Sequence, residues 1–156
     1  MEARLNLFES AVGPKLFKYI NSAGRAISES TLPHDVQELV KIRASQINGC
    51  AMCTDMHTKD AAAAGETQLR LNLVAVWRES TVFTEAEKAA LELAEQGTRL
   101  ADGGRVTDDV WANAAKHYDD DQLAALVGII AVINAYNRIN VLVQQPAGDY
   151  VPGQFA

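Results

Sequence analysis

The sequence has no surplus of basic residues and no basic run. It contains 14 lysines and arginines against 20 aspartates and glutamates, which gives a net charge of −6 and a pI near 5.0. Nucleic acids and anionic membranes both attract basic surfaces. We therefore expect neither a nucleic acid nor a membrane as the main partner.

We also expect neither a signal peptide nor a membrane span. The segment from Met1 to Asn6 has no basic region followed by a continuous apolar core. The most apolar stretch, Leu123 to Val143, is interrupted by Asn134, Asn137, Arg138 and Asn140. Such a polar content is unusual in a helix that faces lipid. We expect a soluble cytoplasmic protein, in a compartment that keeps thiols reduced.

The sequence shows no convincing strand alternation, no internal repeat, no low-complexity segment and no linker. Apolar residues recur instead at helical spacing. A chain of 156 residues is long enough to bury a core without disulfide bonds for support. We predict an all-α fold in which residues 1–156 form a single domain, with a core of about residues 5–145.

Turn and capping signals divide this pattern into helices. Gly13-Pro14 begins the first, and the Pro33-His34-Asp35 turn precedes a second that stops at Asn48-Gly49. Two further helices are expected from near Cys50 to Ala64 and from Thr67 to Trp77. The next begins at a capping box formed by Thr84 and Glu87 and runs to about Gln96. After a loop at Gly103-Gly104, Thr107 caps a short helix, and the last helix runs from Asp119-Asp120-Asp121 to a point before Pro146. The acidic triplet lacks the spacing of a calcium loop, so it is interpreted as a helix start.

The last predicted helix is apolar almost all round, which is typical of a helix buried on every side. In so small a protein, that degree of burial indicates help from a second subunit, so we expect a homo-oligomer. The tail, Ala147 to Ala156, is expected to be loosely ordered or packed on a neighbour.

Two cysteines and a histidine form the most informative cluster. Cys50 and Cys53 are three residues apart in the first turn of a predicted helix, within reach of a disulfide after local adjustment, and His57 follows Cys53 by one turn. A helix N-terminus favours the thiolate, which is the nucleophilic form of cysteine. The break at Asn48-Gly49 lets Glu38 fold back toward the thiols, where a buried carboxylate could accept or relay a proton.

These residues resemble the AhpD-like alkylhydroperoxidase family, within the carboxymuconolactone decarboxylase superfamily. The family pattern is a Glu, eleven residues, Cys-x-x-Cys, three residues and a His, and it is matched by Glu38, Cys50, Cys53 and His57. The likeness extends over roughly Leu5 to Val143, through blocks such as Gly65-Glu66, Trp77-Arg78-Glu79-Ser80, Phe83-Thr84 and Asn137-Arg138-Ile139-Asn140.

The resemblance implies an AhpD-like helical bundle that assembles as a trimer or hexamer. It implies a peroxidase in which the cysteine pair cycles between dithiol and disulfide, His57 and Glu38 relay protons, and no cofactor or metal takes part. The partners would be a hydroperoxide substrate and an external dithiol or protein reductant. The best-known members have a further His directly before the second Cys, where this chain has Met52, so one proton donor of that relay is absent.

Other interpretations of the cluster stay open. Two cysteines, His57 and Glu38 could supply four zinc ligands, although structural zinc usually draws on two spaced ligand pairs and no second pair exists. A redox sensor without turnover, or a non-redox enzyme like the lactone decarboxylases, would use the same fold.

Elsewhere, residue types that often carry function have simpler explanations. His34 and His117 are expected at the surface, Trp77 and Trp111 in the core, and Arg43 in an ion pair with a carboxylate rather than in substrate steering.

Overall fold

The computed structural model describes residues 2–155, in which the regular elements are all helices and no strand occurs. The predicted all-α fold is confirmed. The α-helices are α1 (Gly13–Ser28), α2 (His34–Asn48), α3 (Ala51–Ala63), α4 (Gln68–Leu73), α5 (Glu85–Thr98), α6 (Leu100–Gly103), α7 (Asp108–Ala114) and α8 (Asp120–Val143), and the 3₁₀ turns are η1 (Leu7–Glu9) and η2 (Val74–Glu79).

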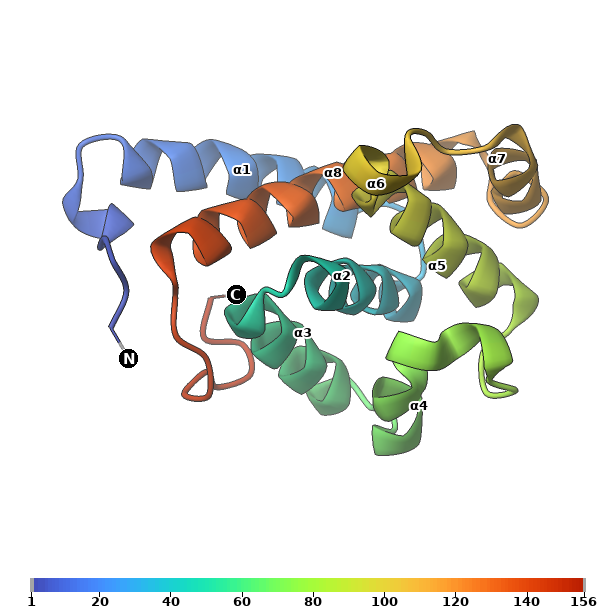
Figure 1. Ribbon diagram of the computed structural model, residues 1–156, viewed down its shortest axis with the longest axis horizontal. Coiled ribbons are helices and arrows are strands. Elements are labelled where there is room, and N and C mark those ends of the chain that lie inside the picture. Colours follow the sequence, from blue (N-terminus) through green and yellow to red (C-terminus); the bar gives the residue numbers. More distant parts are fainter. Residues whose placement is uncertain (1, 156) are drawn as a thin grey trace.

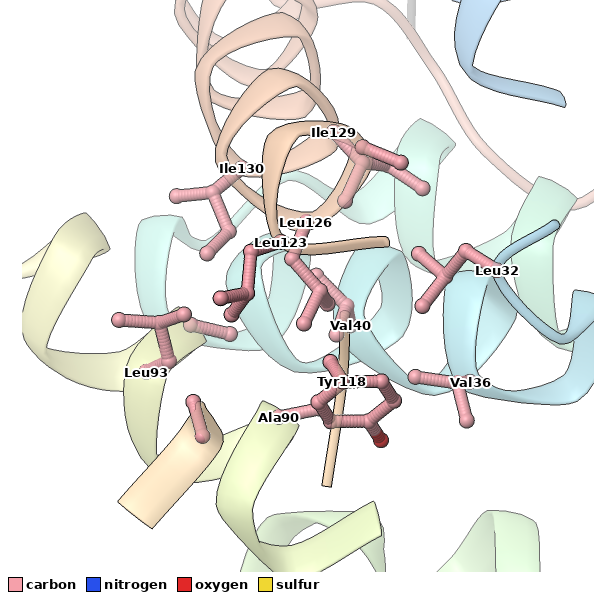
Figure 2. Packing of buried hydrophobic residues seen from close by; sticks show 13 residues of the cluster. Leu32, Val36, Val40, Ala90, Leu93, Tyr118, Leu123, Leu126, Ile129 and Ile130 are labelled. Carbon is pink, nitrogen blue, oxygen red and sulfur yellow. The ribbon is translucent and has the colours of Figure 1, made fainter. Parts of the chain in front are cut away.

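Helix α2 lies at the centre of the molecule, and α3, α5 and α8 all pack against it (Figure 1). On one side, Val36 and Val40 contact a cluster that includes Leu126 and Ile129 of α8 (Figure 2). On the other, Leu39 and Ile42 contact a cluster that includes Leu91 of α5 and Trp77 of η2. Because α2 is buried on both sides, it is a rigid support for polar groups near its ends.

The junction between α2 and α3 places the first cysteine. Gly49 adopts a left-handed backbone with φ of +67°, and its amide bonds back to Gln46 at 3.3 Å. A residue without Cβ takes this conformation at low cost. Cys50 then becomes the N-cap of α3, as the Asn48-Gly49 pair predicted.

Two predicted elements differ from the observed ones. The helix expected from Thr67 to Trp77 ends at Leu73 and continues as the 3₁₀ turn η2, in which Val76 is not helical. The tighter turn lets Trp77 bury its ring and donate from Nε1 to Glu95 at 3.0 Å, a contact 18 residues away that local pattern does not reveal. The loop expected at Gly103-Gly104 is also wrong in part, since Gly103 is the last residue of the short helix α6.

Helix α8 is buried along one face rather than all round. Leu123, Leu126 and Ile133 are buried, whereas Val127 is 49% exposed and Leu142 is 72% exposed. Within one chain α8 is therefore only partly buried, and the expected burial by a second subunit stays a prediction. By length and composition alone α8 could also cross a membrane, which is weak evidence for a single helix. Its start is as predicted, with Asp119 as the N-cap of a capping box.

Two further expectations about burial are corrected. Trp111 is 45% exposed, because the short helix α7 covers the core with Ala114 instead. The described part of the tail is not loose throughout, because it packs in part on its own chain. Tyr150 is buried against α3 of its own chain, where its hydroxyl donates to Asp60 at 2.9 Å and Lys59 donates to the Tyr150 carbonyl at 2.9 Å.

Candidate active site

The two cysteines form a disulfide at the N-terminus of α3. Each is only 1% exposed. Cys50 caps the helix, and its Sγ accepts a hydrogen bond from the backbone N–H of Cys53 at 3.2 Å. The first turn of a helix carries unpaired N–H groups and a partial positive charge, both of which favour a negatively charged sulfur. The position therefore suits thiolate chemistry once the disulfide is reduced.

Glu38 and His57 meet beside this turn, from two different helices. Their side chains are both about nine-tenths buried, and His57 Nδ1 lies 3.1 Å from Glu38 Oε2. Nineteen residues separate them, so the contact exists only because α2 and α3 pack against each other. His57 follows Cys53 by one turn of α3. The structure thus brings Glu38 to His57 and Cys50 to Cys53, as the sequence predicted.

Glu38 is held in its ionised form. Burial alone would raise the pKa of this carboxyl, but the hydrogen bond with His57 and the charge of Lys41 outweigh burial and lower the pKa to about 2. An ionised carboxylate only accepts hydrogen bonds. His57 must then donate from Nδ1, which leaves Nε2 as the ring nitrogen that can exchange a proton.

The same carboxylate borders a cavity of about 460 Å³, with His34, Glu66, Arg70 and Glu87 among the residues around it. His34 Nε2 lies 3.6 Å from Glu38 Oε1, and the His34 side chain is 63% exposed. His34 is therefore a surface residue, as predicted, but its approach to Glu38 was missed. The four-residue spacing between them on α2 is the signal that could have revealed it.

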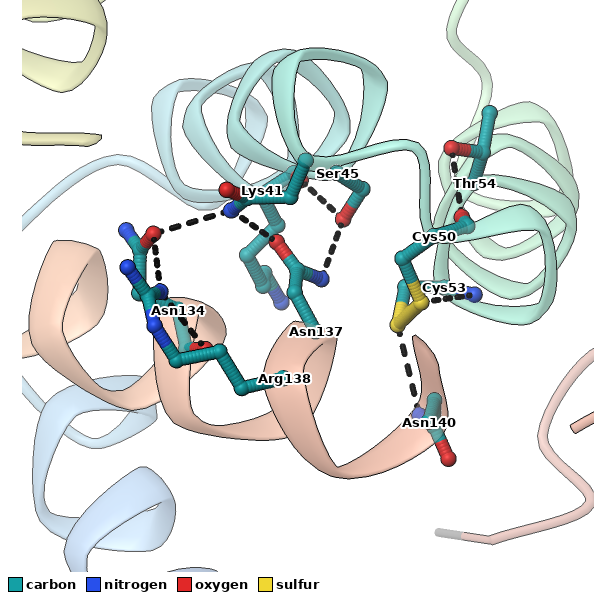
Figure 3. Close-up of a disulfide and its surroundings, with 10 residues drawn as sticks. Lys41, Ser45, Cys50, Cys53, Thr54, Asn134, Asn137, Arg138 and Asn140 are labelled. Atoms are coloured by element: carbon teal, nitrogen blue, oxygen red, sulfur yellow. Dashed lines mark hydrogen bonds between the residues drawn. A yellow bond between two sulfur atoms is a disulfide. The ribbon is translucent and has the colours of Figure 1, made fainter. Parts of the chain in front are cut away.

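The sequence interpretation also missed a set of amides around the disulfide (Figure 3). Asn140 of α8 donates from Nδ2 to Cys53 Sγ at 3.3 Å. One turn earlier, Asn137 is fully buried and donates to Ser45 Oγ at 3.0 Å, while Asn48 donates to Asn137 Oδ1 at 2.9 Å. Polar residues at one-turn spacing within an apolar helix are a signal of such a network.

A separate ion cluster explains Arg43. Its Nε lies 2.5 Å from Glu95 Oε1, and Glu95 also accepts from Arg78 and Trp77. Burial raises the pKa of Glu95, but these three donors outweigh burial and lower it. Arg43 is therefore engaged in a partly buried ion pair, as expected, and is not free to bind an anionic substrate.

No group of three or more His, Cys, Asp or Glu side chains suited to a metal ion occurs among residues 2–155. His117, the third histidine, is exposed. The titratable groups that surround the Glu38 carboxylate are His57 of α3 and Lys41 and His34 of α2.

Comparisons with known proteins concern the family and the fold of the chain. Residues 14–96 match the carboxymuconolactone decarboxylase family. The uncharacterized protein YdfG of Bacillus subtilis is 40% identical over 141 residues, which cover 90% of this chain and 94% of YdfG.

Two solved structures share the fold. The first is a protein of unknown function from Agrobacterium tumefaciens, described as a candidate antioxidant defence protein AhpD. It is 34% identical, with a TM-score of 0.88 and coverage of 96% of this chain and 100% of that one. The second is the debrominase Bmp8 with 2,3,4-tribromopyrrole, at 18% identity and a TM-score of 0.78, covering 87% of this chain and 72% of that one. At this identity the likeness to Bmp8 concerns the fold alone.

Proposed function

The chain belongs to the carboxymuconolactone decarboxylase family, and we propose that it is a thiol-dependent peroxidase of the AhpD-like type. One observation carries the proposal. A Cys50–Cys53 disulfide occupies the N-terminal turn of α3, one turn before a histidine that is hydrogen-bonded to an ionised, buried glutamate. The description of the Agrobacterium relative as an antioxidant protein supports it.

In the proposed cycle, the reduced pair consumes one hydroperoxide. A cysteine thiolate attacks the peroxide, the O–O bond breaks, and the alkoxide leaves as an alcohol after taking a proton. The attacking sulfur is now a sulfenic acid. The second thiol attacks that sulfur, a disulfide forms and water leaves. A dithiol or protein reductant then transfers two electrons and two protons to the disulfide and becomes oxidised itself.

His57 and Glu38 handle the protons in this scheme. His57 accepts the thiol proton at Nε2 and returns one to the leaving alkoxide, which is general acid–base catalysis. Glu38 holds Nδ1 in its protonated form and stabilises the imidazolium by its negative charge. Since Met52 supplies no proton, this pair carries the whole relay. We expect Glu38→Gln to slow peroxide consumption about 100-fold, within the usual range for such groups.

Counting thiols tests the proposal directly. The protein is reduced, freed of reductant and mixed with one equivalent of an organic hydroperoxide, and free thiols are counted over time. We expect both thiols to disappear and an added dithiol to restore them. The variants Cys50→Ser and Cys53→Ser should form no disulfide within the chain, and a sulfenic acid trapped in one of them identifies the cysteine that attacks the peroxide.

Two results would contradict the proposal. Thiols that react no faster than free cysteine would exclude peroxide as the substrate, and full activity in both single variants would exclude the pair as its centre. Either result would favour a non-redox activity or a sensing role on the same fold. We also propose that the chain assembles as a trimer or hexamer, that a dithiol or protein reductant is its partner, and that it is cytoplasmic.

A further inference from the structure

The amide of Asn140 is the one side-chain group that donates a hydrogen bond to either sulfur among the described residues. Asn140 lies in the last two turns of α8, far from the cysteines in sequence, and its Nδ2 reaches Cys53 Sγ at 3.3 Å (Figure 3). Cys50 Sγ has a different donor, the backbone N–H of Cys53. The two sulfurs therefore differ in what stabilises them.

The position of Asn140 is imposed by the residues before it on α8. Asn137 bonds to Ser45 and Asn48, and Asn134 accepts from Asn48 at 2.9 Å. Both partners lie at the end of α2, just before the Gly49 turn that leads to Cys50. These bonds fix α8 relative to the start of α3. The amide of Asn140 is thus held against the sulfur by a network that is independent of it.

Such a contact acts differently on the two redox forms. A disulfide sulfur is a weak acceptor, so the bond stabilises the oxidised form little. A thiolate is charged and takes a much stronger hydrogen bond from the same amide. A donor that favours the charged form lowers the pKa of the group it contacts. Asn140 therefore stabilises the state in which Cys53 carries negative charge.

We propose that Asn140 is a catalytic residue that holds the Cys53 sulfur as a thiolate, which makes Cys53 more acidic and the disulfide easier to reduce. The inference rests on the proposed redox role of the pair. Reduction by an external dithiol breaks the S–S bond, delivers two electrons to the two sulfurs, and leaves the reductant as a disulfide. Stabilising one product thiolate makes the protein disulfide the stronger oxidant.

The test measures a thiol pKa rather than turnover. In the Cys50→Ser background, Cys53 is the single thiol, and its rate of alkylation by iodoacetamide is followed against pH. We expect Asn140→Leu to raise the pKa of Cys53 by about one unit. The thiolate fraction below that pKa then falls about tenfold. Asn140→Asp keeps the size and polarity of the side chain but adds a like charge, so it should raise the pKa further.

Matched controls separate this role from a structural one. In the Cys53→Ser background, Asn140→Leu should leave the pKa of Cys50 unchanged. Asn113→Leu makes the same substitution at an exposed position of α7, outside the network that positions Asn140, and should leave the pKa of Cys53 unchanged. If Asn140→Leu does not fold, as judged by circular dichroism, the Asn140→Asp variant decides.

An unchanged Cys53 pKa in the folded Asn140 variants, or an equal rise for Cys50, would overturn the inference. The outcome is separable from that of the proposed function. A raised Cys53 pKa in a protein that does not consume hydroperoxide would disprove the peroxidase proposal and leave the role of Asn140 standing. Rapid peroxide consumption with an unchanged Cys53 pKa would support the peroxidase proposal and overturn the role of Asn140.

Discussion

At the residue scale, the site depends on a carboxylate that stays charged while buried. Burial alone would raise the pKa of Glu38, and the structure offsets this with His57 on one carboxylate oxygen and Lys41 on the other. The exposed His34 lies near the Lys41 side of the carboxylate, at the edge of a cavity that water can enter. Glu38 therefore lies between His57 and the cavity.

The low pKa of Glu38 predicts a specific pH dependence of stability. Its folded pKa is about 2, below the ordinary 4.5, so ionised Glu38 stabilises the fold above pH 4.5 and this contribution is lost as the pH falls toward 2. We expect Glu38→Gln to lower the free energy of unfolding at pH 7 by on the order of 2 kcal/mol. Urea unfolding at pH 7, 4 and 2.5 should show the difference from wild type shrinking toward acid.

The control for that experiment is Glu2→Gln, at an exposed position ahead of the first helix. It should change the free energy of unfolding by no more than about 0.5 kcal/mol at any of these pH values. A difference between wild type and Glu38→Gln that grows on acidification would show that the carboxyl is neutral in the fold, contrary to the arrangement described.

At the element scale, the turn between α2 and α3 decides where the sulfurs lie. Gly49 is left-handed, and a Cβ at this position would meet no atom within 4 Å. The cost of a side chain there is backbone strain alone. Gly24 offers the opposite case, because it lies inside α1 with ordinary helical backbone and equally open space.

These two glycines predict effects of opposite sign. Gly49→Ala should lower the free energy of unfolding by about 1 kcal/mol, since alanine is disfavoured at positive φ. Gly24→Ala should raise it by up to about 1 kcal/mol, since alanine is the better helix former. Thermal or urea unfolding of both variants measures this. Equal effects of the same sign would show that the Gly49 turn does not require its left-handed conformation.

At the scale of the whole molecule, apolar side chains remain exposed along two helices that pack together. Large apolar residues of α8 and of the segment through α1 are more than one-third exposed, among them Phe8, Val12, Tyr19, Val127 and Leu142. Burying such side chains in a subunit interface is favourable. Assembly of several copies would complete the burial that the composition of α8 led us to expect.

We expect the 16.9 kDa chain to assemble as a trimer or hexamer. Native mass spectrometry or light scattering measures the mass of the assembly. Leu142→Glu places a charge on the exposed side of α8 and should shift the population to smaller species. Leu69→Glu, at a similarly exposed leucine of α4, should not. A wild-type mass near that of one chain at micromolar concentration would contradict the prediction of a homo-oligomer.

The sequence by itself determined the features that depend on neighbours along the chain. The all-α class follows from the 3.6-residue period, and most helix ends follow from local caps such as Thr84 with Glu87 and the Gly49 stop. The spacing of Cys50, Cys53 and His57 within one helix was likewise local. Such signals are strong because they involve backbone groups and side chains within a few residues.

Only the tertiary structure decided which helix faces meet. The approach of Glu38 to the cysteine and histidine cluster was anticipated from the Asn48-Gly49 break and the family pattern. The contact between Asn140 and Cys53 joins residues 87 apart and was not anticipated. Trp77 and Trp111 occupied similar apolar patterns, yet one is buried and the other exposed. Periodicity tells which residues share a face, but the partner of that face is set by packing over the whole chain. The chemistry of the two sulfurs therefore rests on local spacing, and their surroundings rest on the fold.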